Sequence, residues 1–229
     1  MRWRRLFTFG CSYTEYYWET WADIIGRDLG IPYYNYGLSG CGNSLIAHRM
    51  LEADIEHGLS SDDLILVNWT SWWREDRVNP RGDWLVRGHI FNNPHYSGEF
   101  IKRYWNTYND TAKNAGAIIS SNRAFPIVYQ SHMTDYEIDD YSDALAHFST
   151  LVSALPEKNV FDISNNSKFG GTETDTHPDI LCHLNHAIKI YDYCGLTMKP
   201  ETVEWCNARQ EELINRNKKK LNKITESIK

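Results

Sequence analysis

Three short segments of the chain carry residues that could perform nucleophilic chemistry. The first is Gly10–Thr14, in which Ser12 follows a short apolar run. The second is the glycine-rich segment Asn35–Asn43, and the third is Asp175–Pro178, which contains His177. A serine hydroxyl beside a histidine can attack a carbonyl carbon, because the imidazole accepts the hydroxyl proton. The segments therefore predict a serine nucleophile and a histidine base.

Apolar runs typical of buried strands alternate along the chain with stretches of helical spacing. We expect strands at 6–9, 32–36, 64–67, 126–129 and 160–163, and helices at 18–29, 44–55, 99–117, 140–155 and 178–193. This alternation predicts a three-layer α/β/α fold around a flavodoxin-like parallel sheet of about five strands. Ligands bind beyond the carboxyl ends of such strands, where Ser12 and His177 are expected. Residues 74–97 are expected to form a long excursion over this face.

Each segment also has a purely structural interpretation. Ser12 could cap the first helix, and the glycines of 35–43 could form an ordinary turn. His177 could be a polar surface residue, although Pro178 suits the first turn of a helix and places His177 just before it. Cys11 is expected to be buried, pointing away from Ser12. The order of the segments along the strands favours catalysis.

Taken together, the segments resemble the motif blocks of the SGNH (GDSL-like) serine hydrolases. Gly10–Thr14 is similar to the block that carries the nucleophile. Asn35–Gly40 is similar to the block whose glycine supplies an oxyanion N–H, and Asp175–Pro178, followed by His183, is similar to the last block. The resemblance spans about residues 6–194. It implies an ester hydrolase that works through an acyl-enzyme and needs no metal or organic cofactor.

The resemblance also assigns roles to single residues. Ser12 is the nucleophile, His177 the general base, and Asp175 the acid that orients the imidazole, with Glu173 or a backbone carbonyl as alternatives. The backbone N–H groups of Ser12 and Gly40 receive the oxyanion. The family's usual third donor, an asparagine, falls near Trp72 here, so the further candidate donors are Asn43, Ser71 and Asn68.

The substrate is expected to be an acetyl or other small acyl ester, with a carbohydrate favoured. The chain has 9 Trp and 14 Tyr, whose flat rings can stack on sugars. Candidate substrate-binding residues are Trp69, Trp72 and Trp73.

Three alternatives remain open. The cluster of Asp175, His177, Cys182, His183 and His186 could bind a metal. The chain could instead be a binding module that has lost catalysis on the same fold. The same serine and histidine could also transfer the acyl group to a hydroxyl other than water.

Composition and charge restrict the partners, the compartment and the domain organisation that we expect. The net charge of −6 argues against general nucleic-acid binding, and no apolar stretch is long enough to span a membrane. The odd number of cysteines, five, argues against a disulfide framework, and the N-terminus does not resemble a signal peptide. We therefore expect a cytoplasmic protein at synthesis, and packaging into a particle stays possible. We expect a hydrolase domain at 1–198 and a polar helical extension at 199–229. The extension could mediate oligomers, and its deletion is expected to leave activity largely intact.

Overall fold

The computed structural model describes residues 2–71, 74–90, 96–104, 106–133, 160–161 and 177–227. The chain divides into two compact units. The first, which we call the sheet unit, comprises Met1–Glu15 and Pro32–Phe161. The second, which we call the helical unit, comprises Tyr16–Ile31 and Asp162–Lys229.

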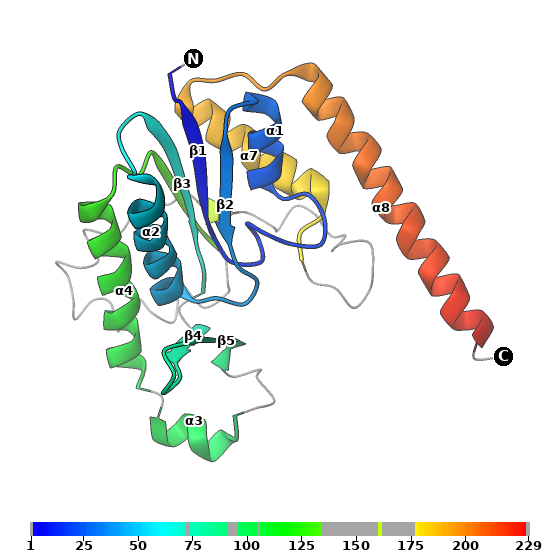
Figure 1. The fold of residues 1–229 in the computed structure, drawn as a ribbon. Coiled ribbons are helices and arrows are strands. Elements are labelled where there is room, and N and C mark those ends of the chain that lie inside the picture. Colours follow the sequence, from blue (N-terminus) through cyan, green and yellow to red (C-terminus); the bar gives the residue numbers. More distant parts are fainter. Residues whose placement is uncertain are drawn as a thin grey trace. The chain divides into compact units, whose positions relative to one another are not determined.

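The sheet unit is built on five parallel strands (Figure 1). They are β1 (Arg5–Gly10), β2 (Tyr33–Gly37), β3 (Asp63–Trp69), β6 (Tyr129–Met133) and β7 (Val160–Phe161). Their order in the sheet, β2-β1-β3-β6-β7, is that of a flavodoxin-like fold. The predicted α/β class and five-stranded parallel sheet are therefore confirmed.

The core of the sheet unit lies along β1 and β3. Both strands are largely apolar and buried, with Phe7, Phe9 and Ile65 fully covered. Continuous apolar runs of this kind are typical of central parallel strands, which are buried on both faces. Helix α2 (Asn43–His57) packs on β1, β2 and α4 (Thr107–Ala124).

The segment after β3 differs from the prediction. It forms an antiparallel hairpin of β4 (Arg74–Val78) and β5 (Trp84–His89). Asn79 closes the turn, because its Oδ1 accepts the N–H groups of Arg81 and Asp83 at 2.8 and 3.0 Å. The helix predicted at 99–117 is two helices, α3 (Gly98–Tyr104) and α4. The helix predicted at 140–155 lies outside the described residues.

The helical unit contains α1 (Trp21–Leu29), α7 (Ile180–Cys194) and α8 (Pro200–Ser227). Helix α7 packs on α1, and α8 packs on both. Asp28 ties the three together, since its carboxylate accepts from Tyr191 Oη at 2.7 Å and from the Lys199 N–H at 3.0 Å. The helix expected within 199–229 is α8, and the division into a hydrolase domain at 1–198 and an extension stays a prediction.

No helix in the described part of the chain combines the length and the apolar character that crossing a membrane requires.

Candidate active site

Ser12 lies in a tight turn that follows β1 directly. It is buried, with 3% of its surface exposed. The Thr14 N–H donates to the carbonyl of Cys11 at 2.9 Å and closes the turn. Only glycine fits at Gly10, because a Cβ there would lie 2.0 Å from Thr14 Oγ1. Cys11 is fully buried, as predicted.

The side chain of Asn35 fixes this turn against two strands. Its Nδ2 donates to the Thr14 carbonyl at 2.9 Å. Its Oδ1 accepts from Thr8 Oγ1 at 3.1 Å and from the Gly37 N–H at 2.9 Å. These bonds link β1, β2 and the turn, so Asn35 restrains the backbone on both sides of Ser12.

The alternative role of Ser12, as the cap of the first helix, is wrong. Helix α1 begins at Trp21, and its N-cap is Thr20. The N–H and Oγ1 of Thr20 both donate to Asp23 Oδ2, at 2.9 and 3.0 Å. Residues 13–20 therefore separate Ser12 from the helix it was expected to precede closely.

A second turn, formed by residues 38–41, is tied to the Ser12 turn at the carboxyl edge of the sheet. Gly10 and Gly37 are partners in the sheet, so both turns start at the same level. The carbonyl of Gly10 accepts from the Leu38 N–H at 3.0 Å and from Cys41 Sγ at 3.3 Å. Gly40 has a φ of 83°, a conformation that favours glycine. The structure thus brings the Ser12 and Gly40 turns together.

The β4–β5 hairpin holds the Gly40 turn from outside. The Gly88 N–H donates to the Gly40 carbonyl at 3.1 Å. A Cβ on Gly40 would lie 3.1 Å from Val86 Cγ1. Val86 is paired with Asp76, next to an irregularity in the strand register. Such irregularities re-aim side chains, and here Asp76 is directed at the start of α2.

Asp76 caps helix α2 and was not anticipated from the sequence. Its Oδ1 accepts from the Gly42 N–H at 2.7 Å, and its Oδ2 accepts from the Leu45 N–H at 2.8 Å. A Cβ on Gly42 would approach Oδ2 to 2.8 Å, so glycine makes room for the carboxylate. Burial raises the pKa of Asp76, and the two N–H groups oppose that shift. The sequence did contain a signal for the hairpin that carries Asp76. Residues 79–83 are typical of a turn and lie between two short segments that could form strands.

The three candidate side-chain donors differ in their contacts. Asn43 Nδ2 donates to the Thr70 carbonyl and to Asn114 Oδ1, each at 3.0 Å, while its Oδ1 accepts the Thr70 N–H at 2.9 Å. These contacts use both amide hydrogens, so Asn43 braces the end of β3 instead of donating to a ligand. Asn68 Nδ2 donates to Ser131 Oγ on β6 at 2.8 Å. Ser71 is buried, just beyond the braced Thr70.

The predicted substrate-binding tryptophans need one correction. Trp69 is fully buried, and its Nε1 donates to Gln130 Oε1 at 2.9 Å. It is a core residue, because β3 is a central strand that is buried at every position. Trp72 and Trp73 lie outside the described residues.

His177 lies in the helical unit, three residues before α7. The ring of Tyr16 stacks on its imidazole, with centroids 3.9 Å apart and 20° between the planes. Trp18 packs edge-on against Tyr16 at 4.5 Å, and its Nε1 donates to the Pro178 carbonyl at 2.8 Å. The aromatic run before α1 thus holds the segment that carries His177. The sequence did not assign a role to these residues.

Helix α7 starts later than predicted. Its N-cap is Asp179, whose Oδ1 accepts the Cys182 N–H at 2.8 Å, so Pro178 precedes the helix instead of lying in its first turn. Gln210 of α8 completes this cap. Its Oε1 accepts the Ile180 N–H at 3.1 Å, and its Nε2 donates to Asp179 Oδ2 at 3.2 Å.

Asp175 and Glu173, the predicted orienting acids, lie outside the described residues.

Three members of the cluster considered for a metal site, Cys182, His183 and His186, lie on α7. His183 and His186 are buried on α7. Burial lowers the pKa of His183 well below its ordinary value, helped by His186 and His177, and lowers the pKa of His186 to about 3. Both imidazoles are therefore neutral at pH 7. Within the described ranges, no three His, Cys, Asp or Glu side chains are grouped to hold a metal ion.

No protein-family model matches the chain, and no curated protein matches its sequence. Solved structures do match. Several are lipolytic proteins of the G-D-S-L family or esterases.

Three of these structures overlap with most of the chain. The lipase Lip_vut3 from a goat rumen metagenome has a TM-score of 0.49 and 11% identity, over 85% of this chain and 99% of its own. The esterase EstA from Pseudoalteromonas sp. has a TM-score of 0.48 and 12% identity, over 84% and 97%. A G-D-S-L family protein from Veillonella parvula has a TM-score of 0.44 and 13% identity, over 82% and 96%.

Proposed function

We propose that the chain is a serine ester hydrolase with Ser12 as nucleophile and His177 as general base. The observation that carries the proposal is the Ser12 turn, which is buried at the carboxyl edge of the sheet and tied to the Gly40 turn. Ligands of parallel α/β sheets bind at this edge. A serine held there beside a glycine turn has the surroundings that attack on a carbonyl requires.

The reaction proceeds in two stages. Ser12 Oγ attacks the acyl carbon while His177 accepts its proton, and the N–H groups of Ser12 and Gly40 receive the oxyanion. The alcohol then leaves with the proton from His177, giving an acyl-enzyme. Water attacks the acyl carbon as His177 takes a proton from it, and His177 then returns that proton to Ser12 Oγ as the bond to the acyl carbon breaks and the carboxylic acid leaves.

The geometry of the helical unit supports the role of His177. Its imidazole is half-buried and stacked on Tyr16, which limits rotation of the ring. Asp175 is proposed to accept the N–H on the far side of the imidazole, as in other triads. The proposal requires Ser12 Oγ and His177 to come within hydrogen-bond distance during turnover. We propose an acetyl or other small acyl ester of a carbohydrate as substrate.

Hydrolysis of p-nitrophenyl acetate tests the mechanism. We expect Ser12→Ala and His177→Ala each to lower kcat/KM by about 10³-fold or more. The matched controls are Ser61→Ala, at an exposed turn, and His48→Ala, at a partly exposed position on α2. Both should keep wild-type rates. A fluorophosphonate should label the wild type and not Ser12→Ala.

Other outcomes would redirect the proposal. Turnover that survives Ser12→Ala and is abolished by a chelator would favour the metal alternative. A folded wild type with neither turnover nor labelling would favour a binding module. Labelling combined with acyl transfer to an added sugar, at the expense of hydrolysis, would identify an acyltransferase.

A further inference from the structure

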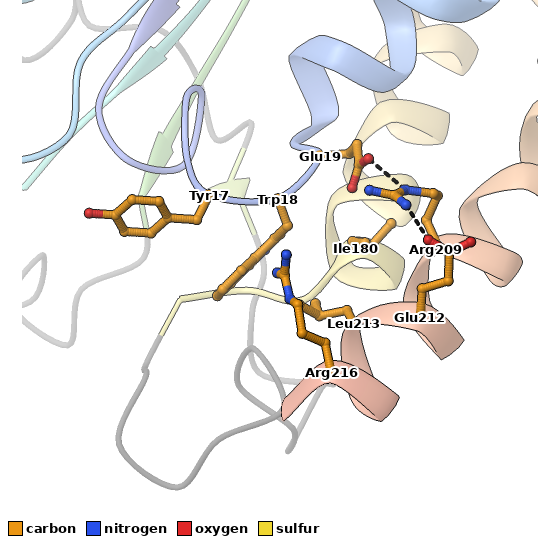
Figure 2. Close-up of a pocket in the computed structure, with 8 residues that line it drawn as sticks. All are labelled: Tyr17, Trp18, Glu19, Ile180, Arg209, Glu212, Leu213 and Arg216. Carbon is orange, nitrogen blue, oxygen red and sulfur yellow. Dashed lines mark hydrogen bonds and ion pairs between the residues drawn. The ribbon is translucent and has the colours of Figure 1, made fainter. Parts of the chain in front are cut away.

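The helical unit contains a cavity of about 260 Å³ that the proposed mechanism does not use. Residues before α1, the first turn of α7 and the middle of α8 line it (Figure 2). Its apolar side is formed by Ile180 and Leu213, which are almost fully buried. Its volume lies just below the range of pockets for drug-sized ligands, roughly 300–1,000 Å³. A ligand of monosaccharide size therefore suits it.

Trp18 supplies a rigid aromatic wall. The hydrogen bond from its Nε1 to the Pro178 carbonyl fixes the indole, and the edge contact with Tyr16 restrains it further. Figure 2 shows the indole standing beside the side chains of Leu213 and Arg216. A ring that is already fixed loses little conformational entropy on binding, so it favours a flat or ring-shaped ligand.

The two arginines of the cavity differ in their partners. Arg209 is neutralised, because its Nε lies 2.7 Å from Glu19 Oε1 and its Nη1 contacts Glu212 Oε2. Arg216 is exposed and directs its guanidinium toward the cavity beside Trp18 (Figure 2). None of the ion pairs between described residues involves Arg216. The cavity therefore offers one guanidinium to an anionic ligand.

We propose that this cavity binds an acidic sugar unit, with its carboxylate on Arg216 and its ring against Trp18. A guanidinium binds a carboxylate through two parallel hydrogen bonds. Glu212, which is largely exposed, can accept a hydrogen bond from a sugar hydroxyl. An aromatic carboxylate without hydroxyl groups would offer Glu212 no hydrogen-bond donor. Glu212 therefore favours a sugar acid over an aromatic acid.

The sugar unit is proposed as the alcohol part of the ester substrate, a step that rests on the proposed function. The Trp18 indole is bonded to Pro178, the residue after His177, so a ligand on Trp18 lies close to the segment that carries the base. If His177 is the base, the cavity lies in the same unit as the base and next to the segment that carries it. Helix α8, which supplies Arg209, Glu212, Leu213 and Arg216, then has a part in substrate choice.

The test uses full-length Ser12→Ala protein and the probe D-glucuronate, with binding followed by calorimetry and saturation-transfer NMR. We expect Arg216→Gln to raise the dissociation constant about fivefold or more, and Trp18→Phe to raise it as well. The matched control is Arg81→Gln, which removes an exposed arginine from the sheet unit and should leave binding unchanged. Circular dichroism verifies that each variant is folded.

Binding of two further ligands shows whether the cavity requires both the carboxylate and the sugar hydroxyls. Methyl glucoside, which lacks the carboxylate, and benzoate, which lacks the hydroxyls, should both bind more weakly than glucuronate. Equal binding of methyl glucoside would overturn the role of Arg216, and equal binding of benzoate would overturn the sugar. No binding of glucuronate, or binding unchanged in Arg216→Gln, would overturn the site. These results do not depend on turnover, so failure of the esterase assay alone would overturn the mechanism and leave the binding site standing.

Discussion

The two units hold their candidate catalytic residues in different ways. In the sheet unit, Ser12 is positioned by backbone hydrogen bonds between turns, by the side chain of Asn35 and by glycines that admit no Cβ. In the helical unit, His177 is positioned by aromatic packing, and the start of α7 is held by a side chain from α8. The serine side is therefore fixed by hydrogen bonds to and within the backbone, and the histidine side by packing between elements distant in sequence.

This difference predicts where substitutions act. Backbone turns tolerate most exchanges of neighbouring side chains, unless a glycine or a capping group is removed. A site held by packing depends instead on every element that contributes to it. We therefore expect the helical unit to be the more sensitive to loss of a remote segment, and the sheet unit to loss of a single buried polar group.

Deletion of residues 200–229 is expected to have the largest effect. It removes the buried side chains of Cys206 and Leu213 and leaves the Ile180 N–H without Gln210. At about 1.5–3 kcal/mol for the buried leucine, with the smaller contribution of Cys206 and the lost cap added, the cost is a large part of the total stability of a small domain. We expect loss of cooperative unfolding by circular dichroism and loss of esterase activity. This replaces the expectation from the sequence that the tail is dispensable.

A shorter deletion provides the control. Removing residues 218–229 keeps Cys206, Gln210 and Leu213, so unfolding and activity should stay close to those of the full chain. If the longer deletion were as stable and active as this control, α8 would not support His177. The contrast between the two units would then fail.

Asp76→Ala is expected to have the next largest effect, in the sheet unit. It leaves the Gly42 and Leu45 N–H groups at the start of α2 without acceptors. Two buried donors without partners cost about 2–4 kcal/mol together. Urea unfolding should show that loss, and kcat for p-nitrophenyl acetate should fall because the Gly40 turn loosens. Asp62→Ala, at an exposed carboxylate next to β3, should change neither.

Asp76→Asn removes the titratable carboxyl group, and it also replaces one of the two acceptor oxygens with an amide NH2 that cannot accept from the helix N–H. Because burial raises the pKa of Asp76 in the folded protein, the folded state binds its proton more tightly than the unfolded state. Wild-type stability should therefore fall as pH rises from the unfolded pKa, near 3.9, through the raised folded pKa. Asp76→Asn should lose that slope. An unchanged slope would show that Asp76 is not the group responsible.

The sequence allowed the sheet to be predicted because its central strands are continuous apolar runs. The same regularity placed Ser12 and Gly40 at one edge, since parallel strands end together. Asp76 could not be found this way, because a polar residue in a short, largely polar strand has no apolar period to mark it. The Tyr16–His177 stack joins residues that are far apart in sequence, so no local pattern predicts it. Trp69 was misassigned because composition cannot distinguish a buried tryptophan from one at a surface.

Tyr16→Leu is expected to have the smallest effect, and it tests the packing account of the histidine side most directly. Loss of a stacked aromatic pair is worth about 0.5–1.5 kcal/mol, so kcat should fall about two- to tenfold while KM changes little. Tyr16→Phe keeps the ring and should restore the rate, and Tyr193→Leu, at an exposed position on α7, is the matched control. If Tyr16→Phe were as slow as Tyr16→Leu, the hydroxyl and not the stacked ring would be what holds His177, and the histidine side would then depend on hydrogen bonding, as the serine side does.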